Sequence, residues 1–230
     1  MTTAAPSTAL AARRWAVIAA AGLSGVLVFV SMLVDPAPSA DGRELAAAYA
    51  ADTAASGLHT NLIHYGFALV APVVYVLVGM VRGRGGWLAN IAGLLAVIGL
   101  STLPGMVMLD LTTTAAVQVT DVDTAYAIEQ QLGERLSFLA IVIPAFVSSV
   151  LALPLAVAAL WRARLVHGGI VLAGLAAAVA PNLLPWWLGF GANMVWMLGL
   201  ALVLWRLPLS AWTGRAGAAT APVEERVPAL

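Results

Sequence analysis

The chain has 230 residues, of which 62% are hydrophobic and only 10% are charged, and its mean hydropathy is +0.95. These proportions exclude an ordinary soluble domain, whose apolar share lies near half. The chain has no cysteine, which excludes disulfides, thiolate metal sites and thiol catalysis. We therefore expect an all-α fold, a polytopic bundle of transmembrane helices in contact with the lipid bilayer.

Six apolar segments are long enough to cross a membrane, because a helix needs about 20 residues to span the hydrocarbon. They are residues 15–34, 62–81, 87–109, 136–161, 165–184 and 188–205. The last two would be one uncharged stretch without Pro181 and Pro185, which predict a break between them. The first segment resembles a signal peptide in its Arg13-Arg14 start, but it is longer than a usual signal core, so we interpret it as a retained span.

The arginines are distributed unevenly over this six-span arrangement. All 11 cationic side chains are arginines, and only Arg43 and Arg135 fall on one side of it. The other nine arginines lie in the terminal segments and in the connections after the second and fourth spans: Arg13, Arg14, Arg82, Arg84, Arg162, Arg164, Arg206, Arg215 and Arg226. The positive-inside rule places that side, with both termini, in the cytoplasm. The chain has no lysine and is rich in alanine and arginine, which is typical of proteins from GC-rich bacterial genomes. We therefore expect a bacterial protein of the inner membrane.

Two outer connections are predicted to hold short extracytoplasmic helices. Asp41 and Glu44 form a pattern typical of a capping box, and Gly57 is a candidate helix end. Thr120 or Asp121 is expected to begin the second helix. The tails, residues 1–12 and 213–230, are rich in Ala, Pro and Thr, and we expect both to be disordered and cytoplasmic.

The chain also shows signs of internal repetition as three tandem hairpins. Arginine pairs precede the first, third and fifth spans, and each is followed within the span by an Ala-Gly-Leu sequence. The first two outer connections share an Ala-Tyr-Ala pattern at Tyr49 and Tyr126. A duplicated hairpin explains these matches, and so does selection for inner arginines in an alanine-rich chain.

Polar side chains at three predicted helix ends define a candidate ligand-binding pocket. His59 and His64 lie at the outer entrance to the second span, Asp110 ends the third, and Asn182 ends the fifth. Intramembrane polar groups usually face protein or water, so these four residues are expected to converge on one outward-facing pocket. The alternative is that each of them simply meets headgroups and water at its own helix end.

Other kinds of site have little support in the sequence. His59 and His64 are five residues apart, about 140° around a helix, whereas paired helical metal ligands share one face. His64 and His167 are predicted near opposite boundaries of the membrane, so they cannot both bind the iron of one haem. We therefore expect no metal or other cofactor, no catalytic residue and no nucleic-acid partner.

The function predicted from these features is non-enzymatic: a transporter-like, sensory or accessory bundle whose ligand or partner meets the outer face. A membrane-protein partner or a second copy of the chain is compatible with such a bundle. The alternative is an integral membrane enzyme that acts on a lipid or quinone at the outer interface through His64 and Asp110.

Overall fold

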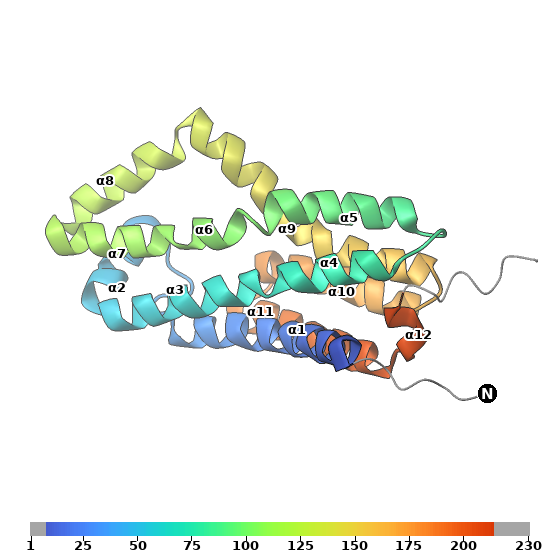
Figure 1. Cartoon of the computed structure of the whole chain (residues 1–230). Helices are drawn as coiled ribbons and strands as arrows, with labels where there is room; N and C mark the ends of the chain where they lie inside the picture. Colours follow the sequence, from blue (N-terminus) through green and yellow to red (C-terminus); the bar gives the residue numbers. More distant parts are fainter. Residues whose placement is uncertain (1–7, 214–230) are drawn as a thin grey trace, which may run out of the picture.

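The computed structural model describes residues 8–213, and this part of the chain contains helices and no strands. The helices form an elongated bundle with short helices at each end (Figure 1). Their bounds are α1 Thr8–Val34, α2 Gly42–Ala51, α3 Thr53–Ala68, α4 Val70–Met80, α5 Gly86–Gly99, α6 Leu103–Val107, α7 Leu109–Val119, α8 Val122–Gly133, α9 Leu136–Arg162, α10 Gly168–Leu183, α11 Trp186–Arg206 and α12 Leu209–Trp212.

Within residues 8–213, five helical segments are long and apolar enough to cross a membrane: α1, α3 with α4, α5 through α7, α9 and α11. The expected all-α bundle is confirmed, and this is the architecture of a multi-pass membrane protein. The expected span 165–184 is shorter than predicted, since α10 has 16 residues and rises roughly 24 Å. The hydrocarbon core is about 30 Å thick, so α10 alone falls short of a full crossing.

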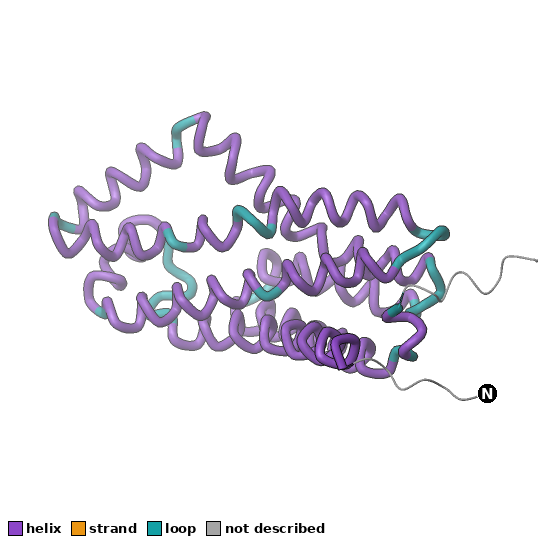
Figure 2. Tube along the Cα trace, in the orientation of Figure 1, coloured by secondary structure: helices purple, strands orange, loops and turns teal. Residues whose placement is uncertain are grey.

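Two of the long helical segments are interrupted, as the loop positions in Figure 2 show. A turn at Leu69 separates α3 from α4, and a break at residues 100–102 separates α5 from α6. Pro104 stands at the start of α6, where its missing amide hydrogen costs no helical hydrogen bond. The interruptions divide each of these two spans into two parts along its length.

Small residues allow the helices of the bundle to pack closely. A Cβ placed on Gly99 of α5 would overlap the Ser149 backbone of α9, and one on Gly25 of α1 would overlap Met197 of α11. Gly174 of α10 lies under the ring of Trp196. Close backbone approach of this kind is the usual basis of helix association in membranes, where the solvent is as apolar as the side chains.

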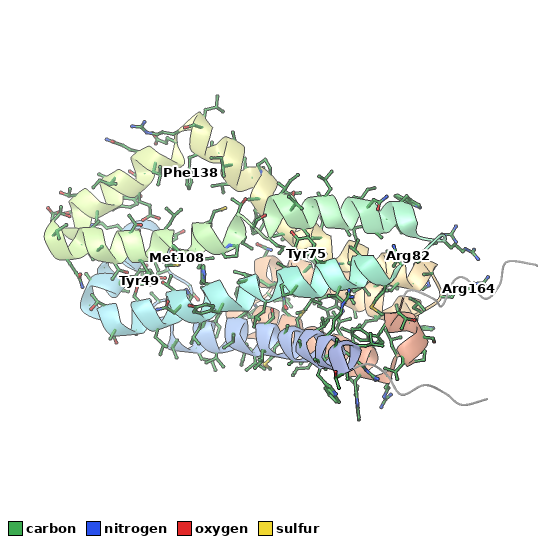
Figure 3. The ribbon with its side chains drawn as sticks, in the orientation of Figure 1. Tyr49, Tyr75, Arg82, Met108, Phe138 and Arg164 are labelled. Carbon is green, nitrogen blue, oxygen red and sulfur yellow. The ribbon has the colours of Figure 1, made fainter. Side chains whose placement is uncertain are left out.

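The two ends of the bundle differ in charge. Arg82 and Arg164 lie at the end opposite to α2, α7 and α8 (Figure 3). At that second end, Arg43 of α2 pairs with Asp123 of α8 at 2.5 Å, and Gly42 lies against the ring of Tyr126. The two expected short helices are therefore present and pack on one another.

Some local expectations are wrong or fall outside the described residues. The side chain of Asp41 makes no cap hydrogen bond. Gly57 lies inside α3, because α3 begins at Thr53 and is capped by Asp52, whose carboxylate accepts from the Ala55 amide. Asp121 does begin α8 by accepting from the Thr124 amide. Helix α1 already begins at Thr8, and the remainder of the two expected disordered tails, residues 1–7 and 214–230, lies outside the described part.

Candidate functional site

Polar side chains from five elements gather at the arginine-poor end of the bundle, and we call them the polar cluster: Asp35, Tyr49, His59, Asp110 and Glu129. Asp35 follows α1 directly, and the others lie on α2, α3, α7 and α8. Tyr49 is seen in Figure 3 at the end where α2 and α3 meet. The cluster therefore brings together segments that are far apart in the sequence.

His59 is at the centre of the polar cluster and is 4% exposed. Its Nδ1 lies 3.0 Å from the Ser31 carbonyl oxygen, which can only accept, so Nδ1 carries a proton and donates. Nδ1 is also 3.6 Å from Oδ2 of Asp35, and Nε2 is 3.9 Å from Oδ2 of Asp110. Both ring nitrogens thus face a carboxylate, and the two carboxylates come from different helices.

Local backbone structure holds Asp35 in this position. Asp35 ends α1, where its own amide donates to the Ser31 carbonyl, and its Oδ1 accepts from the Ala37 amide across Pro36. This is the turn that a short acidic side chain commonly makes with the backbone two residues later. The turn leaves Oδ2 directed at His59, and the Asp35 side chain is only 6% exposed.

A chain of hydroxyl groups fixes Asp110 relative to α3. The Thr114 hydroxyl donates to the Asp110 carbonyl oxygen at 2.8 Å and is 2.6 Å from the Ser56 hydroxyl. Ser56 and Thr114 are both buried, and the Ser56 carbonyl accepts from the hydroxyl of Thr60. The first turn of α7 is therefore bound to the α3 surface that carries His59.

Tyr49 and Glu129 close the polar cluster from α2 and α8. The Tyr49 ring is buried and its centroid lies 6.5 Å from that of His59. Burial raises the pKa of Tyr49, and the negative charges of Asp110, Asp35 and Glu129 raise it further. Burial also raises the pKa of Glu129, whose Oε2 is enclosed without a hydrogen-bond partner in the described part. The cluster is thus rich in carboxylates and contains no arginine.

The four residues expected to form one pocket are divided between three places. His59 and Asp110 come together as expected. His64 is half-buried, and its Nδ1 lies 2.7 Å from the Pro104 carbonyl of α6. Asn182 lines a separate cavity of about 310 Å³ in the middle of the bundle, and that cavity is not lined by His59, His64 or Asp110. The single pocket that contains all four residues is therefore not formed.

Asp35 is the main residue that sequence reasoning missed. It ends the first span just before Pro36, at the same predicted depth as the polar residues that were selected. The sequence signal for Asp35 was an acidic residue at the end of a span, followed by a proline.

The polar cluster combines an imidazole with carboxylates, which are groups that can donate and accept protons. The ring nitrogens of His59 face one carbonyl and two carboxylates, and no hydroxyl nucleophile lies within hydrogen-bond distance of them in the described residues. Between residues 8 and 213, no three His, Asp or Glu side chains are arranged to hold a metal ion.

No protein-family model, no curated protein and no solved structure matches this chain.

Proposed function

We propose that the protein is a non-enzymatic membrane bundle of sensory or transporter type in which the polar cluster takes up and releases a proton. The observation that carries this proposal is His59, a buried imidazole with a carboxylate facing each ring nitrogen. Histidine is the side chain whose charge ordinarily changes between about pH 5 and pH 8. A membrane protein that responds to a proton needs such a group in contact with more than one helix.

The two protonation states of His59 differ in how well they hold the helices together. With both ring nitrogens protonated, the imidazolium charge offsets part of the negative charge of Asp35 and Asp110. When Nε2 loses its proton, the carboxylates of buried Asp35 and partly exposed Asp110 repel each other without that compensation. Deprotonation therefore weakens the contact between α7 and the pair α1 and α3. It also weakens the contact of α2 and α8, which lie beside α7, with the same pair.

Spin labels can test whether the end of the bundle moves with pH. The chain has no native cysteine, so Ala127→Cys on α8 and Ser210→Cys on α12 supply the only two labelling positions. We expect the distance distribution between the labels to change between about pH 5.5 and pH 8.5 in lipid nanodiscs. The change should disappear in His59→Gln and persist in the matched variant His64→Gln. Identical distributions at the two pH values, or a change that survives His59→Gln, would contradict the proposal.

We also propose that the arginine-rich end is cytoplasmic, so that the polar cluster responds to the outer compartment. Ala127→Cys and Ser210→Cys, made singly, test this orientation with a membrane-impermeant maleimide applied to intact cells. Ala127→Cys should be labelled and Ser210→Cys should be labelled only after the membrane is permeabilised. The reverse pattern would place the cluster inside. The lipid bilayer is the first partner of the bundle, and exposed apolar side chains such as Leu136 and Ile141 of α9 contact it.

The enzyme alternative has less support. It needs His64 and Asp110 to act together on a lipid or quinone, but His59 is the imidazole that faces Asp110, and His64 bonds to a backbone carbonyl. General acid–base catalysis also needs a substrate within hydrogen-bond reach of the catalytic group, and the contacts of His59 are with the protein itself.

A further inference from the structure

The cavity that Asn182 lines is separate from the polar cluster and lies where all six apolar segments meet. Its volume is about 310 Å³, near the lower end of the range for sites that hold drug-sized molecules. It lies at the level of the helix interruptions, with Phe67 and Val70 on either side of the α3–α4 turn and Leu100 and Leu103 on either side of the α5–α6 break. The broken helices leave a space in the middle of the bundle.

Most of the cavity wall is apolar, but two side-chain amides line it. Asn182 comes from α10 and Asn193 from α11. Within the described residues neither amide makes a hydrogen bond. Two neighbouring polar groups do bond to the protein: Trp196 Nε1 donates to the Ile170 carbonyl, and the Ser149 hydroxyl donates to the Phe146 carbonyl. Asn193 is half-buried in surroundings where an unpaired amide is costly. The amides are therefore available to something in the cavity.

The cavity opens sideways between α9 and α10. Among the residues that line it, only Phe146 of α9 and Asn182 of α10 are exposed, and the others are buried or half-buried. Helix α10 ends at Leu183, one residue beyond Asn182, and is the shortest of the six apolar segments. An opening between two helices of a membrane bundle faces the bilayer, so molecules dissolved in the bilayer have direct access to it.

We propose that this cavity binds a bilayer-soluble molecule that has an apolar body and a carbonyl group. The apolar wall receives the body, and the NH₂ groups of Asn193 and Asn182 donate hydrogen bonds to the carbonyl oxygen. This chemistry has two sources in a membrane, the head of an isoprenoid quinone and the carbonyl of an acyl ester. The site is independent of the proton chemistry proposed for His59.

The binding test uses the full chain in nanodiscs of dioleoylphosphatidylcholine, with decylubiquinone as the probe. Trp196 lines the cavity and is 8% exposed, so a quinone bound there quenches its fluorescence. The signal is the part of the quenching that is lost in Trp196→Phe. We expect this part to saturate with probe concentration, whereas partition into the lipid gives quenching that does not saturate.

Matched variants separate binding in the cavity from partition. Ala178→Phe fills the cavity and should weaken binding at least tenfold, whereas Ala176→Phe, on the exposed face of the same helix, should leave it unchanged. Asn193→Leu removes the amide and should weaken binding about threefold to tenfold, with Asn90→Leu as its exposed control. His59→Gln should bind the probe with the same affinity as the unaltered chain. The outcome of this test is therefore independent of the proton proposal.

Competition in the unaltered chain identifies the source of the ligand and does not depend on any variant folding. Methyl oleate carries an ester carbonyl on an apolar chain, and decane is a chain without a carbonyl. Displacement of decylubiquinone by methyl oleate but not by decane supports an acyl ligand, and displacement by neither, with saturable quenching, supports a quinone. Equal displacement by methyl oleate and decane, or quenching that does not saturate, overturns the proposal.

Discussion

The two polar regions of this bundle differ in where their hydrogen-bonding groups find partners. In the polar cluster, His59, Asp35 and the Ser56–Thr114 pair bond mostly to the protein itself. In the central cavity, the amides of Asn182 and Asn193 have no partner in the described part. Asn193 is half-buried and Asn182 is exposed at the edge of the cavity, whereas the enclosed oxygen without a partner in the polar cluster is Oε2 of Glu129. This contrast is the reason why we propose proton uptake for the polar cluster and binding of a separate molecule for the cavity.

The largest effect on stability is expected from His59→Leu. This change leaves the buried Asp35 carboxylate and the partly exposed Asp110 carboxylate without the imidazole that faces both, and a buried polar group left without its partner typically costs about 1 to 3 kcal/mol. We expect a loss of about 3 kcal/mol in the free energy of unfolding, measured by titration with a denaturing detergent. His64→Leu, which removes one bond to the Pro104 carbonyl, should cost about 1 kcal/mol. Equal losses in the two variants would mean that the cluster has no special role in holding the helices.

A smaller and opposite pair of effects is expected from Ser56→Ala and Asn193→Leu. Ser56→Ala removes a buried hydroxyl paired with Thr114 and should lower the free energy of unfolding by about 1 kcal/mol. Asn193→Leu removes an amide without a protein partner, so in ligand-free detergent it should cause no loss. The same detergent titration measures both. A loss in Asn193→Leu as large as that in Ser56→Ala would remove the distinction between the two regions.

The sequence predicts the overall bundle because each span is set by local features. Continuous apolar runs, arginine pairs and the Pro181–Pro185 break are sufficient to place α9 and α11 to within two residues of their observed bounds. The first predicted span is shorter than α1, and the third predicted span stops where α7 begins. In both cases polar residues, such as Arg13 and Thr112, continue the helix beyond the apolar run. Membrane helices need internal hydrogen bonds throughout, and nothing in those residues ends them.

The candidate site was only partly predictable, because it depends on which way each helix faces. His59 and His64 are separated by about 140° on α3, so they meet different elements, α7 and α6. Asp35 reaches His59 through a turn at Pro36 that no periodicity describes. Asn182 lines the cavity in the middle of the bundle, because α10 is placed against α9 and α11, away from the part of α3 that carries His59. Direction around a helix axis is decided by packing, and single-sequence patterns do not contain it.

The pH dependence of stability should distinguish Glu129 from exposed carboxylates. Burial raises the pKa of Glu129 in the folded state, so the folded chain holds this proton more tightly than the unfolded chain does. Linkage then requires that stability falls as pH rises from the ordinary value of 4.5 through the folded-state pKa. Glu129→Gln, which stays neutral, should flatten the stability profile in this interval, as measured by thermal unfolding at a series of pH values. The exposed Glu44→Gln should keep the slope, and an unchanged slope in Glu129→Gln would mean that Glu129 is not enclosed in solution.

The smallest effect separates two aspartates that have the same backbone conformation. Asp41 and Asp121 both have φ −136° and ψ 168° and both precede a short helix. Only the side chain of Asp121 accepts hydrogen bonds, from the amide and the hydroxyl of Thr124. These bonds lower the pKa of Asp121, so its contribution to stability is present above its ordinary pKa and is lost as pH falls through the lowered one.

Asp121→Ala should therefore speed hydrogen exchange at the first amides of α8, most of all at Thr124, because a helix start without its cap frays. Asp41→Ala should leave exchange at the start of α2 unchanged. The difference should disappear in acid, where the protonated Asp121 side chain is a weaker acceptor. Since Asp123, which pairs with Arg43, lies in this same first turn, fraying there would also loosen the contact between α8 and α2 that covers the polar cluster. Equal exchange in the two variants would show that α8 is held by packing against α2 and α7, with no contribution from its cap.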